Sequence, residues 1–231
     1  MKKLIIASAL SAAFVSPAVF AQATGFTGFY GQVGLGMNSA GTDASTTVPQ
    51  APQFGNFFGG KLGEQNVAGN VALGYNYSLP NGLTIGANVF YNISGDSAGS
   101  LTINEATFDN GDPNNSLTAS NRLKNIWGIS VEPGYAFNNS LGYLKLGWAQ
   151  AQNSWSTNAD GLGSIGFGTT NGFLYGVGFK HAINKNVYVG VEVYQIAFGK
   201  KSSTLNEDGT LTTFSSKPNY TYGGIVLGAR F

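Results

Sequence analysis

The stretch that decides the fold spans residues 83–94 and reads LTIGANVFYNIS. Every second residue, from Leu83 to Ile93, is apolar, and the residues between them are mostly Thr, Gly, Asn and Ser. Successive side chains of a β-strand point to opposite sides, so this alternation predicts a strand with one apolar and one polar face. A helix would need apolar residues three or four positions apart, and the stretch lacks that spacing.

The same alternation recurs on both sides of this stretch. Segments with this pattern lie near 27–38, 67–79, 127–137, 141–153, 172–183, 187–194 and 220–231. Together with residues 83–94 they make eight predicted strands. An even number of strands of this length is typical of an all-β, antiparallel, up-and-down barrel that crosses a membrane.

The connections between these strands alternate in length. Pro80-Asn81-Gly82, Asn138-Asn139 and Asn184-Lys185-Asn186 predict tight turns, because Gly and Asn tolerate the positive φ that such turns require. The four other connections are rich in Ser, Thr, Asn and Gly, and we expect long loops over 39–66, 95–122, 154–171 and 200–219. Short turns at one rim and long loops at the other are typical of outer-membrane barrels.

The composition distinguishes a membrane barrel from a soluble, lipocalin-like barrel. Charged residues make up only 10% of the 231 residues, against about 25% in an ordinary soluble domain. The apolar faces of the predicted strands carry no charge, as a lipid-facing wall requires. Lys and Arg number 12 and Asp and Glu 11, so the charges nearly balance and nucleic acid is not an expected partner.

The N-terminus has the features of an export signal. Two lysines follow the first methionine, and an apolar run and small residues come next. We expect cleavage after Ala21 or Ala23, so that residues 1–23 form a signal peptide and residues 24–231 the barrel domain. The alternative, a retained anchor helix, is disfavoured because the apolar run is short for a membrane span.

The polar faces of the predicted strands carry a small set of charged side chains that we expect to point into the lumen. The turn at Asn138-Asn139 sets a register in which Glu132 faces Lys145, and the turn at 184–186 places Glu192 diagonal to Lys180. Buried charges must be paired, because their desolvation is otherwise costly. The predicted lumen ion-pair network consists of Glu132, Lys145, Lys180, Glu192 and Arg230.

Two interpretations of this lumen stay open. The first is a static ion-pair core, which plugs the barrel together with large inward side chains. The second is a gate whose charges rearrange to pass small solutes or ions. Eight strands enclose a space just wide enough for side chains, which favours the plug. The inward aromatic residues expected to fill it are Tyr30, Phe90, Tyr188, Tyr194 and Tyr222.

Pro133 interrupts the pattern. It falls inside the predicted strand 127–137, where it cannot donate a ladder hydrogen bond. We therefore expect a β-bulge at Pro133, which would put the Glu132–Lys145 register in doubt.

The last segment, Tyr220–Phe231, alternates strictly and ends in phenylalanine. On this segment and on the pattern of the whole chain, the sequence resembles the small eight-stranded outer-membrane barrels of the opacity-protein and outer-membrane-protein-A type. The resemblance implies a location in the bacterial outer membrane and an interior network of Glu with Arg or Lys. It also implies a C-terminal signal for the barrel-assembly machinery, formed here by Tyr222, Ile225, Leu227 and Phe231.

Catalytic and metal-binding patterns are weak. The one histidine, His181, is predicted at the short-turn rim, facing lipid or interface, with no Ser–acid arrangement around it. A glycosidase-like pair of Glu132 and Glu192 is disfavoured by their cationic neighbours. The stretch 109–115 is rich in oxygen ligands but lacks the spacing of a calcium loop, so we interpret it as a solvated turn. We expect no enzyme, metal or cofactor.

The expected role is structural and surface-interactive, through the four long extracellular loops. The first loop contains an aromatic cluster at Phe54, Phe57 and Phe58 that fits either contact with a ligand or an extension of the apolar wall. The expected partners are outer-membrane lipid and lipopolysaccharide, the barrel-assembly machinery, and a host or cell-surface ligand at the loops. The alternative function is a narrow porin-like channel gated by the lumen charges.

Overall fold

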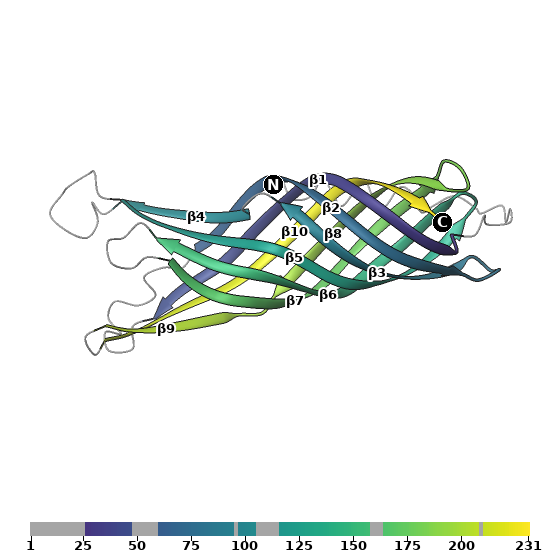
Figure 1. Cartoon of the computed structure of the whole chain (residues 1–231). Coiled ribbons are helices and arrows are strands. Elements are labelled where there is room, and N and C mark those ends of the chain that lie inside the picture. Colours follow the sequence, from purple (N-terminus) through teal and green to yellow (C-terminus); the bar gives the residue numbers. More distant parts are fainter. Residues whose placement is uncertain (1–25, 48–59, 95–96, 105–115, 158–163, 208–209) are drawn as a thin grey trace.

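The computed structural model describes residues 26–47, 60–94, 97–104, 116–157, 164–207 and 210–231 (Figure 1). The predicted signal peptide, the aromatic cluster of the first loop and the stretch 109–115 lie outside these residues. The described elements are β1 Gly28–Thr47, β2 Gly60–Ser78, β3 Leu83–Ser94, β4 Ser97–Asn104, β5 Ser116–Phe137, β6 Ser140–Thr157, β7 Ser164–Ala182, β8 Val187–Phe198, β9 Lys201–Glu207 and β10 Thr210–Arg230.

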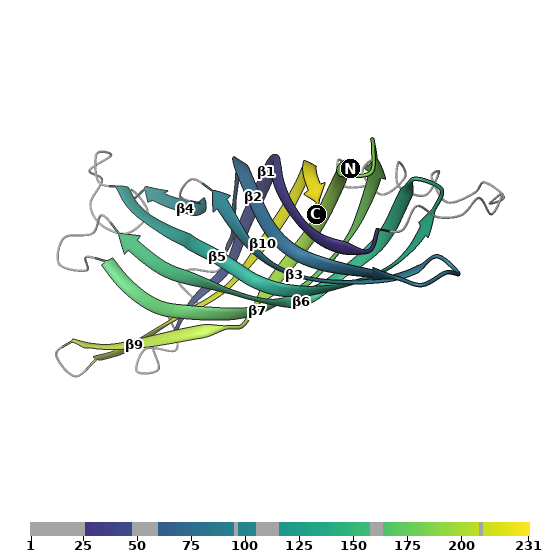
Figure 2. The ribbon, with the colours of Figure 1, turned by 45° about the vertical axis from the view of Figure 1, so that its right-hand side comes forward.

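The strands close into an eight-stranded antiparallel barrel, as the sequence predicts. The order is β1-β2-β3-β5-β6-β7-β8-β10, and β10 pairs with β1 to complete the circle. The two remaining strands, β4 and β9, add no new position to the barrel. The strand β4 continues the line of β3 and also pairs with β5, and β9 continues the line of β8 and also pairs with β10. Figures 1 and 2 show β4 and β9 at the end of the barrel opposite the C-terminus.

The three tight turns set the predicted registers. Asn138 adopts a φ of 50°, and the strands it joins pair Gly134 with Tyr143 and Val131 with Leu146. Gly82 adopts a φ of 87° in the turn between β2 and β3, a conformation that glycine adopts at little steric cost. The turn between β7 and β8 pairs Gly178 with Glu192. These registers confirm the ones that the turns predict.

The predicted bulge at Pro133 is wrong. Pro133 pairs with Ile85 of β3 in continuous register, and the register towards β6 is the same on both sides of it. The missing N–H only interrupts the ladder towards β6 and adds no residue. The register shift of β5 lies instead between Lys124 and Trp127, where Asn125 adopts a φ of 52°.

The predicted bounds of the long loops are also wrong, because most of their residues are strand. The strand β1 continues to Thr47, β2 begins at Gly60, and β5 begins at Ser116. Beyond the apolar wall both faces of a strand are polar, so the backbone pairing continues after the sequence alternation has ended. The connections between these longer strands, 48–59, 105–115, 158–163 and 208–209, lie outside the described residues.

The apolar face of the sheet forms the outer wall, and the soluble alternative is therefore wrong. The side chains of β3 alternate strictly between exposed and buried, with Leu83 and Ile85 outside and Asn88 inside. Aromatic pairs mark both edges of the wall. Phe29 and Tyr75 lie 4.9 Å apart at the short-turn rim, and Trp127 and Trp148 lie 5.5 Å apart towards the opposite rim. Aromatic residues are typical of membrane interfaces.

The part of the chain that the structure describes holds no helix long and apolar enough to cross a membrane.

Candidate functional site in the barrel lumen

Four charged side chains meet inside the barrel, one each from β5, β6, β7 and β8. The Lys145 Nζ lies 3.1 Å from Glu132 Oε1 and 3.2 Å from Glu192 Oε2. The Lys180 Nζ lies 3.0 Å from Glu132 Oε2. All four side chains are buried. We call Glu132, Lys145, Lys180 and Glu192 the lumen ion cluster; its two positive and two negative charges cancel.

The pairing within the cluster differs in part from the prediction. Glu132 does bind Lys145, but Lys180 also binds Glu132, and the second carboxylate, Glu192, binds Lys145. Glu192 and Lys180 do lie diagonal to each other, as predicted, but they form no ion pair among the described residues. In a narrow closed barrel a long lysine side chain reaches strands beyond its neighbour, so pairing along one hairpin does not decide its partner.

A glycine makes room for one of the cluster's contacts. Tyr143 of β6, Gly178 of β7 and Glu192 of β8 lie in register across three strands. A Cβ atom at Gly178 would lie 2.2 Å from Cζ of Tyr143, so the tyrosine ring passes over the glycine. The Tyr143 hydroxyl thereby reaches Glu192 and donates a hydrogen bond to its Oε1.

Neutral donors complete the hydrogen bonds of both carboxylates. Glu132 accepts from Asn88 Nδ2 at 2.6 Å and from the Tyr30 hydroxyl at 3.2 Å. Glu192 accepts from Gln32 Nε2 at 2.9 Å. The Lys180 ammonium also lies 4.4 Å from the ring centroid of Tyr143. Charge-assisted hydrogen bonds and cation–π contacts of this kind offset the desolvation of buried charges.

Arg230 lies at the short-turn rim, apart from the lumen ion cluster. Its Nη2 donates to the Asn184 carbonyl at 3.1 Å, and its guanidinium lies 5.0 Å from the ring centroid of Phe26. Phe26 is fully buried and packs in one cluster with Ala136, Leu141, Tyr143 and Ala182. The sequence analysis missed Phe26 because this residue precedes the first predicted strand. Phe26 nevertheless lies an even number of residues before Tyr30 and points inward like it.

A second layer of buried side chains fills the lumen on the other side of the lumen ion cluster, and it includes hydrogen-bonded Asn70, Asn92 and Tyr194 as well as apolar residues. Its aliphatic and Phe members, all buried, include Leu123, Ile126, Leu174, Ile196 and Phe198. Sequence reasoning predicted Phe90, Tyr194 and Tyr222 of this layer but missed Leu123, Ile126, Ile196 and Phe198, for two reasons. The bulge at 125–126 changes the parity of β5, and Ile196 and Phe198 lie beyond the predicted end of their strand. The inward aromatic residues that it did predict, Tyr30, Phe90, Tyr188, Tyr194 and Tyr222, are all buried.

The short-turn rim contains a Ser–His pair that the sequence analysis did not expect. Ser140 Oγ lies 2.9 Å from His181 Nδ1, since the two residues are register partners on β6 and β7. No acidic side chain hydrogen-bonds His181 in the described part of the chain. Nor do the described residues contain a group of three or more His, Cys, Asp or Glu that would hold a metal ion.

The predicted assembly signal does not lie on one face. Ile225, Leu227 and Phe231 point outward and are exposed, whereas Tyr222 is buried in the lumen. The backbone N–H of Phe231 donates to the Phe29 carbonyl at 3.0 Å, which ties the last residue to the first strand.

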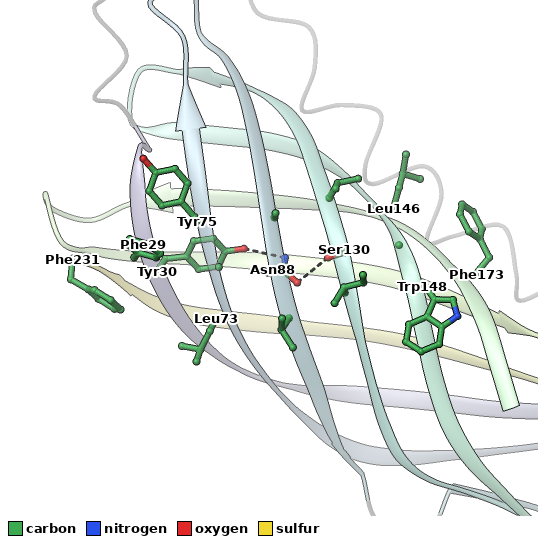
Figure 3. A pocket seen from close by; sticks show the side chains of 16 residues that line it. Phe29, Tyr30, Leu73, Tyr75, Asn88, Ser130, Leu146, Trp148, Phe173 and Phe231 are labelled. Atoms are coloured by element: carbon green, nitrogen blue, oxygen red, sulfur yellow. Dashed lines mark hydrogen bonds between the residues drawn. The ribbon is translucent and has the colours of Figure 1, made fainter. Parts of the chain in front are cut away.

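The outer wall has an apolar groove that follows the pleat of the sheet from strand to strand (Figure 3). Outward side chains such as Leu73, Tyr75 and Trp148 line it. Beneath it, the inward side chain of Asn88 bonds to the Tyr30 hydroxyl at 3.1 Å and accepts from the Ser130 hydroxyl at 2.9 Å (Figure 3). An apolar groove on a lipid-facing wall fits an acyl chain.

Comparisons with known proteins agree with this architecture. The model of a family described as outer membrane protein beta-barrel domain matches residues 5–230. Among solved structures, the outer membrane protein OprG from Pseudomonas aeruginosa is similar, with 10% identity and a TM-score of 0.54 over 90% of this chain and 100% of that chain. Neisserial surface protein A has 15% identity and a TM-score of 0.40 over 89% of this chain and 98% of that one. No curated protein sequence matches the chain.

Proposed function

Because the chain belongs to the outer membrane protein beta-barrel domain family and is an integral protein of the bacterial outer membrane, we propose that it is a structural and surface-interacting barrel. In this proposal side chains plug the lumen and the protein has no enzymatic activity. Function then resides on the surface that the barrel presents to lipid and to the outside of the cell.

The observation that carries this proposal is the layering of the lumen. The lumen ion cluster lies between the layer around Phe26 and the layer around Leu174 and Ile196. Buried side chains fill the lumen on both sides of the cluster, and hydrogen-bonded Asn70, Asn92 and Tyr194 are among them. A lumen that side chains fill, with a neutralised cluster at its centre, supports a plug.

One observation favours a second candidate, a narrow porin-like channel for small solutes or ions. Lys145 lies within 3.2 Å of both carboxylates of the cluster. A lysine shared by two carboxylates has two partners available, so a change of its rotamer would redistribute the ion pairs. For conduction, the side chains that fill the lumen on both sides of the cluster would also have to move apart, and for this reason we place the channel second.

Single-channel conductance in a planar bilayer distinguishes the two functions. The refolded wild-type protein, Glu132→Ala and Lys145→Ala are compared, and heat-modifiable gel mobility confirms that each is folded. The plug predicts no discrete openings in the wild type. Openings in the wild type whose conductance changes in the two variants would support the channel and overturn the plug.

The surface role involves three kinds of partner. The apolar wall contacts outer-membrane lipid, the C-terminal strand is offered to the barrel-assembly machinery, and the outer rim binds a host or cell-surface ligand. The outer parts of β1, β4, β5 and β9 support this last assignment, because they extend the barrel at the end opposite the C-terminus (Figures 1 and 2). Deleting residues 105–115 should abolish the adhesion of bacteria that display the barrel to cells that carry the surface ligand, without changing the gel mobility of the folded barrel. Unchanged adhesion after each outer connection has been deleted in turn would contradict the surface role.

A further inference from the structure

The side chain that closes the lumen at the end of the short turns comes from outside the strands of the barrel. Phe26 precedes β1, which begins at Gly28, yet it is 0% exposed. Its ring packs in one cluster with Ala136, Leu141 and Ala182, which lie on β5, β6 and β7. A residue that belongs to no strand therefore fills part of the lumen at this end.

The ring of Phe26 reaches across the lumen. Its backbone leads into β1, and β6 is the strand opposite β1, reached through β2, β3 and β5 on one side and through β10, β8 and β7 on the other. Leu141 of β6 belongs to the cluster, and the Arg230 guanidinium of β10 lies 5.0 Å from the ring centroid. Tyr143 also belongs to the cluster and bonds Glu192. The layer around Phe26 thus adjoins the lumen ion cluster, and the ring stands between that cluster and the short-turn end.

The segment that carries the ring is attached less firmly than the strand that follows it. The strand β1 pairs with β2 on one side and with β10 on the other, whereas residues 26 and 27 belong to no strand. Besides packing, two contacts attach these residues to the described part of the barrel. Thr27 Oγ1 accepts from the Ser78 backbone N–H at 2.9 Å, and the Arg230 guanidinium contacts the Phe26 ring. A segment with so few hydrogen bonds opens locally at a lower free energy than the paired strands.

Gly28 provides a bend between this segment and the strand. Its φ of 133° lies in a region that residues with a Cβ atom rarely adopt. Gly28 is also the first residue of β1, so a change of its dihedral angles moves Phe26 and leaves the ladder beyond it paired. Residues at the end of an element that absorb such changes act as hinges.

A buried polar atom next to the bend favours opening. Asn76 of β2 is the register partner of Gly28, and its side chain is buried. The Asn76 Oδ1 accepts no hydrogen bond from the described residues. A buried acceptor without a partner destabilises the closed arrangement, and water that enters when the ring leaves would pair with it. The lumen is therefore poised to open at this end.

We propose that Phe26 is a hinged stopper of the lumen. Its ring swings about Gly28, and when the ring leaves, water and small solutes reach the layer next to the lumen ion cluster from the short-turn end. The second layer of buried side chains, on the other side of the cluster, stays in place. This device rests on the proposed plug, because a stopper controls access only to a lumen that side chains otherwise fill.

The test measures how fast a small, charged, membrane-impermeant thiol reagent modifies Ala136→Cys in the folded barrel. Ala136 is buried in the layer around Phe26, and the chain has no cysteine of its own. Phe26→Ala removes the ring and should raise the rate at least about tenfold. Gly28→Ala keeps the ring but strains the bend, and it should raise the rate at least about threefold.

Matched controls make the same kinds of change elsewhere. Phe198→Ala removes a buried phenylalanine from the layer on the other side of the lumen ion cluster. Gly223→Ala adds a Cβ atom that would meet only Val193, at 3.7 Å. Both controls should leave the rate for Ala136→Cys within about twofold of its value without them. Heat-modifiable gel mobility confirms that each variant is folded.

The possible failures of the stopper and of the plug give different results. Slow modification of Ala136→Cys that Phe26→Ala does not accelerate would overturn the stopper and leave the plug intact. Equal acceleration by Phe198→Ala would also overturn the stopper, since the thiol would then respond to any loosening of the lumen. Acceleration by Phe26→Ala but not by Gly28→Ala would overturn the hinge. Modification of Ala136→Cys alone at the rate of an exposed cysteine would contradict the plug itself.

Discussion

At the scale of single residues, Glu132 is the centre of the lumen ion cluster. It accepts from Lys145, Lys180, Tyr30 and Asn88, which is more partners than any other side chain of the cluster has among the contacts described above. Both of its oxygens have a cation within 3.1 Å. Neutralising this one side chain leaves two buried ammonium groups with a single carboxylate.

Glu132→Gln should therefore lower the free energy of unfolding by about 3–5 kcal/mol, the usual effect of breaking a buried ion pair. Urea unfolding in detergent micelles, followed by Trp fluorescence, measures this loss. The double variant Glu132→Gln with Lys180→Met restores charge balance and should recover at least about half of it. A loss below about 1 kcal/mol in the single variant would show that the cluster contributes little.

Gly178 gives a second prediction at this scale. Gly178→Ala would drive the Tyr143 ring away from Glu192, because the new Cβ would lie 2.2 Å from its Cζ. We expect a loss of about 1–3 kcal/mol in the same unfolding assay. Gly223→Ala is the matched control: its Cβ would meet only Val193, at 3.7 Å, and should be nearly neutral. Similar losses in both variants would contradict the role assigned to Gly178.

At the scale of elements, the sequence alone predicts the number of strands and the registers at the turns. Alternation identifies β3 in full, and Asn138 fixes the register that brings Glu132 to Lys145. Strand length could not be predicted. Apolar and polar residues alternate only where one face of the strand meets lipid and the other meets the lumen, so the alternation ends where the outer face meets water although the strand continues. The bulge was misplaced at Pro133, since a missing N–H interrupts a ladder without requiring an extra residue.

The long strands predict slow amide exchange outside the apolar wall. Residues 39–47 belong to β1 and pair with β10, and most of them also pair with β2. Their backbone amides should exchange with deuterium at least about tenfold more slowly than those of a solvated loop, because opening them breaks sheet hydrogen bonds. Hydrogen–deuterium exchange with mass spectrometry measures this. Exchange over 39–47 as fast as in an unfolded peptide would support the loop predicted from composition.

At the scale of the whole molecule, barrel closure determines what the lumen contains. The alternation of inward and outward residues identified the four charged residues of the cluster. Their ion-pair partners depend on how far the two lysine side chains extend across the barrel. The layers on either side of the cluster were predicted only in part: Phe26 precedes the first predicted strand, and Leu174, Ile196 and their neighbours come together only when the sheet is closed. The resulting arrangement, with the ion cluster between two layers of buried side chains that fill the lumen, is the basis of the plugged-lumen proposal.

The most direct test of the plugged lumen is chemical access to the layer of the ion cluster. The chain has no cysteine, so a single introduced thiol is the only one present. Ser130 lies in that layer, buried and bonded to Asn88, whereas Ser202 is exposed on β9. The measurement is the rate at which a small, charged, membrane-impermeant thiol reagent modifies Ser130→Cys and Ser202→Cys in the folded barrel. A plugged lumen predicts a rate for Ser130→Cys at least about a hundredfold lower, because modification then requires local opening of the barrel. Comparable rates for the two variants would contradict it and would mean that water and ions reach the lumen ion cluster.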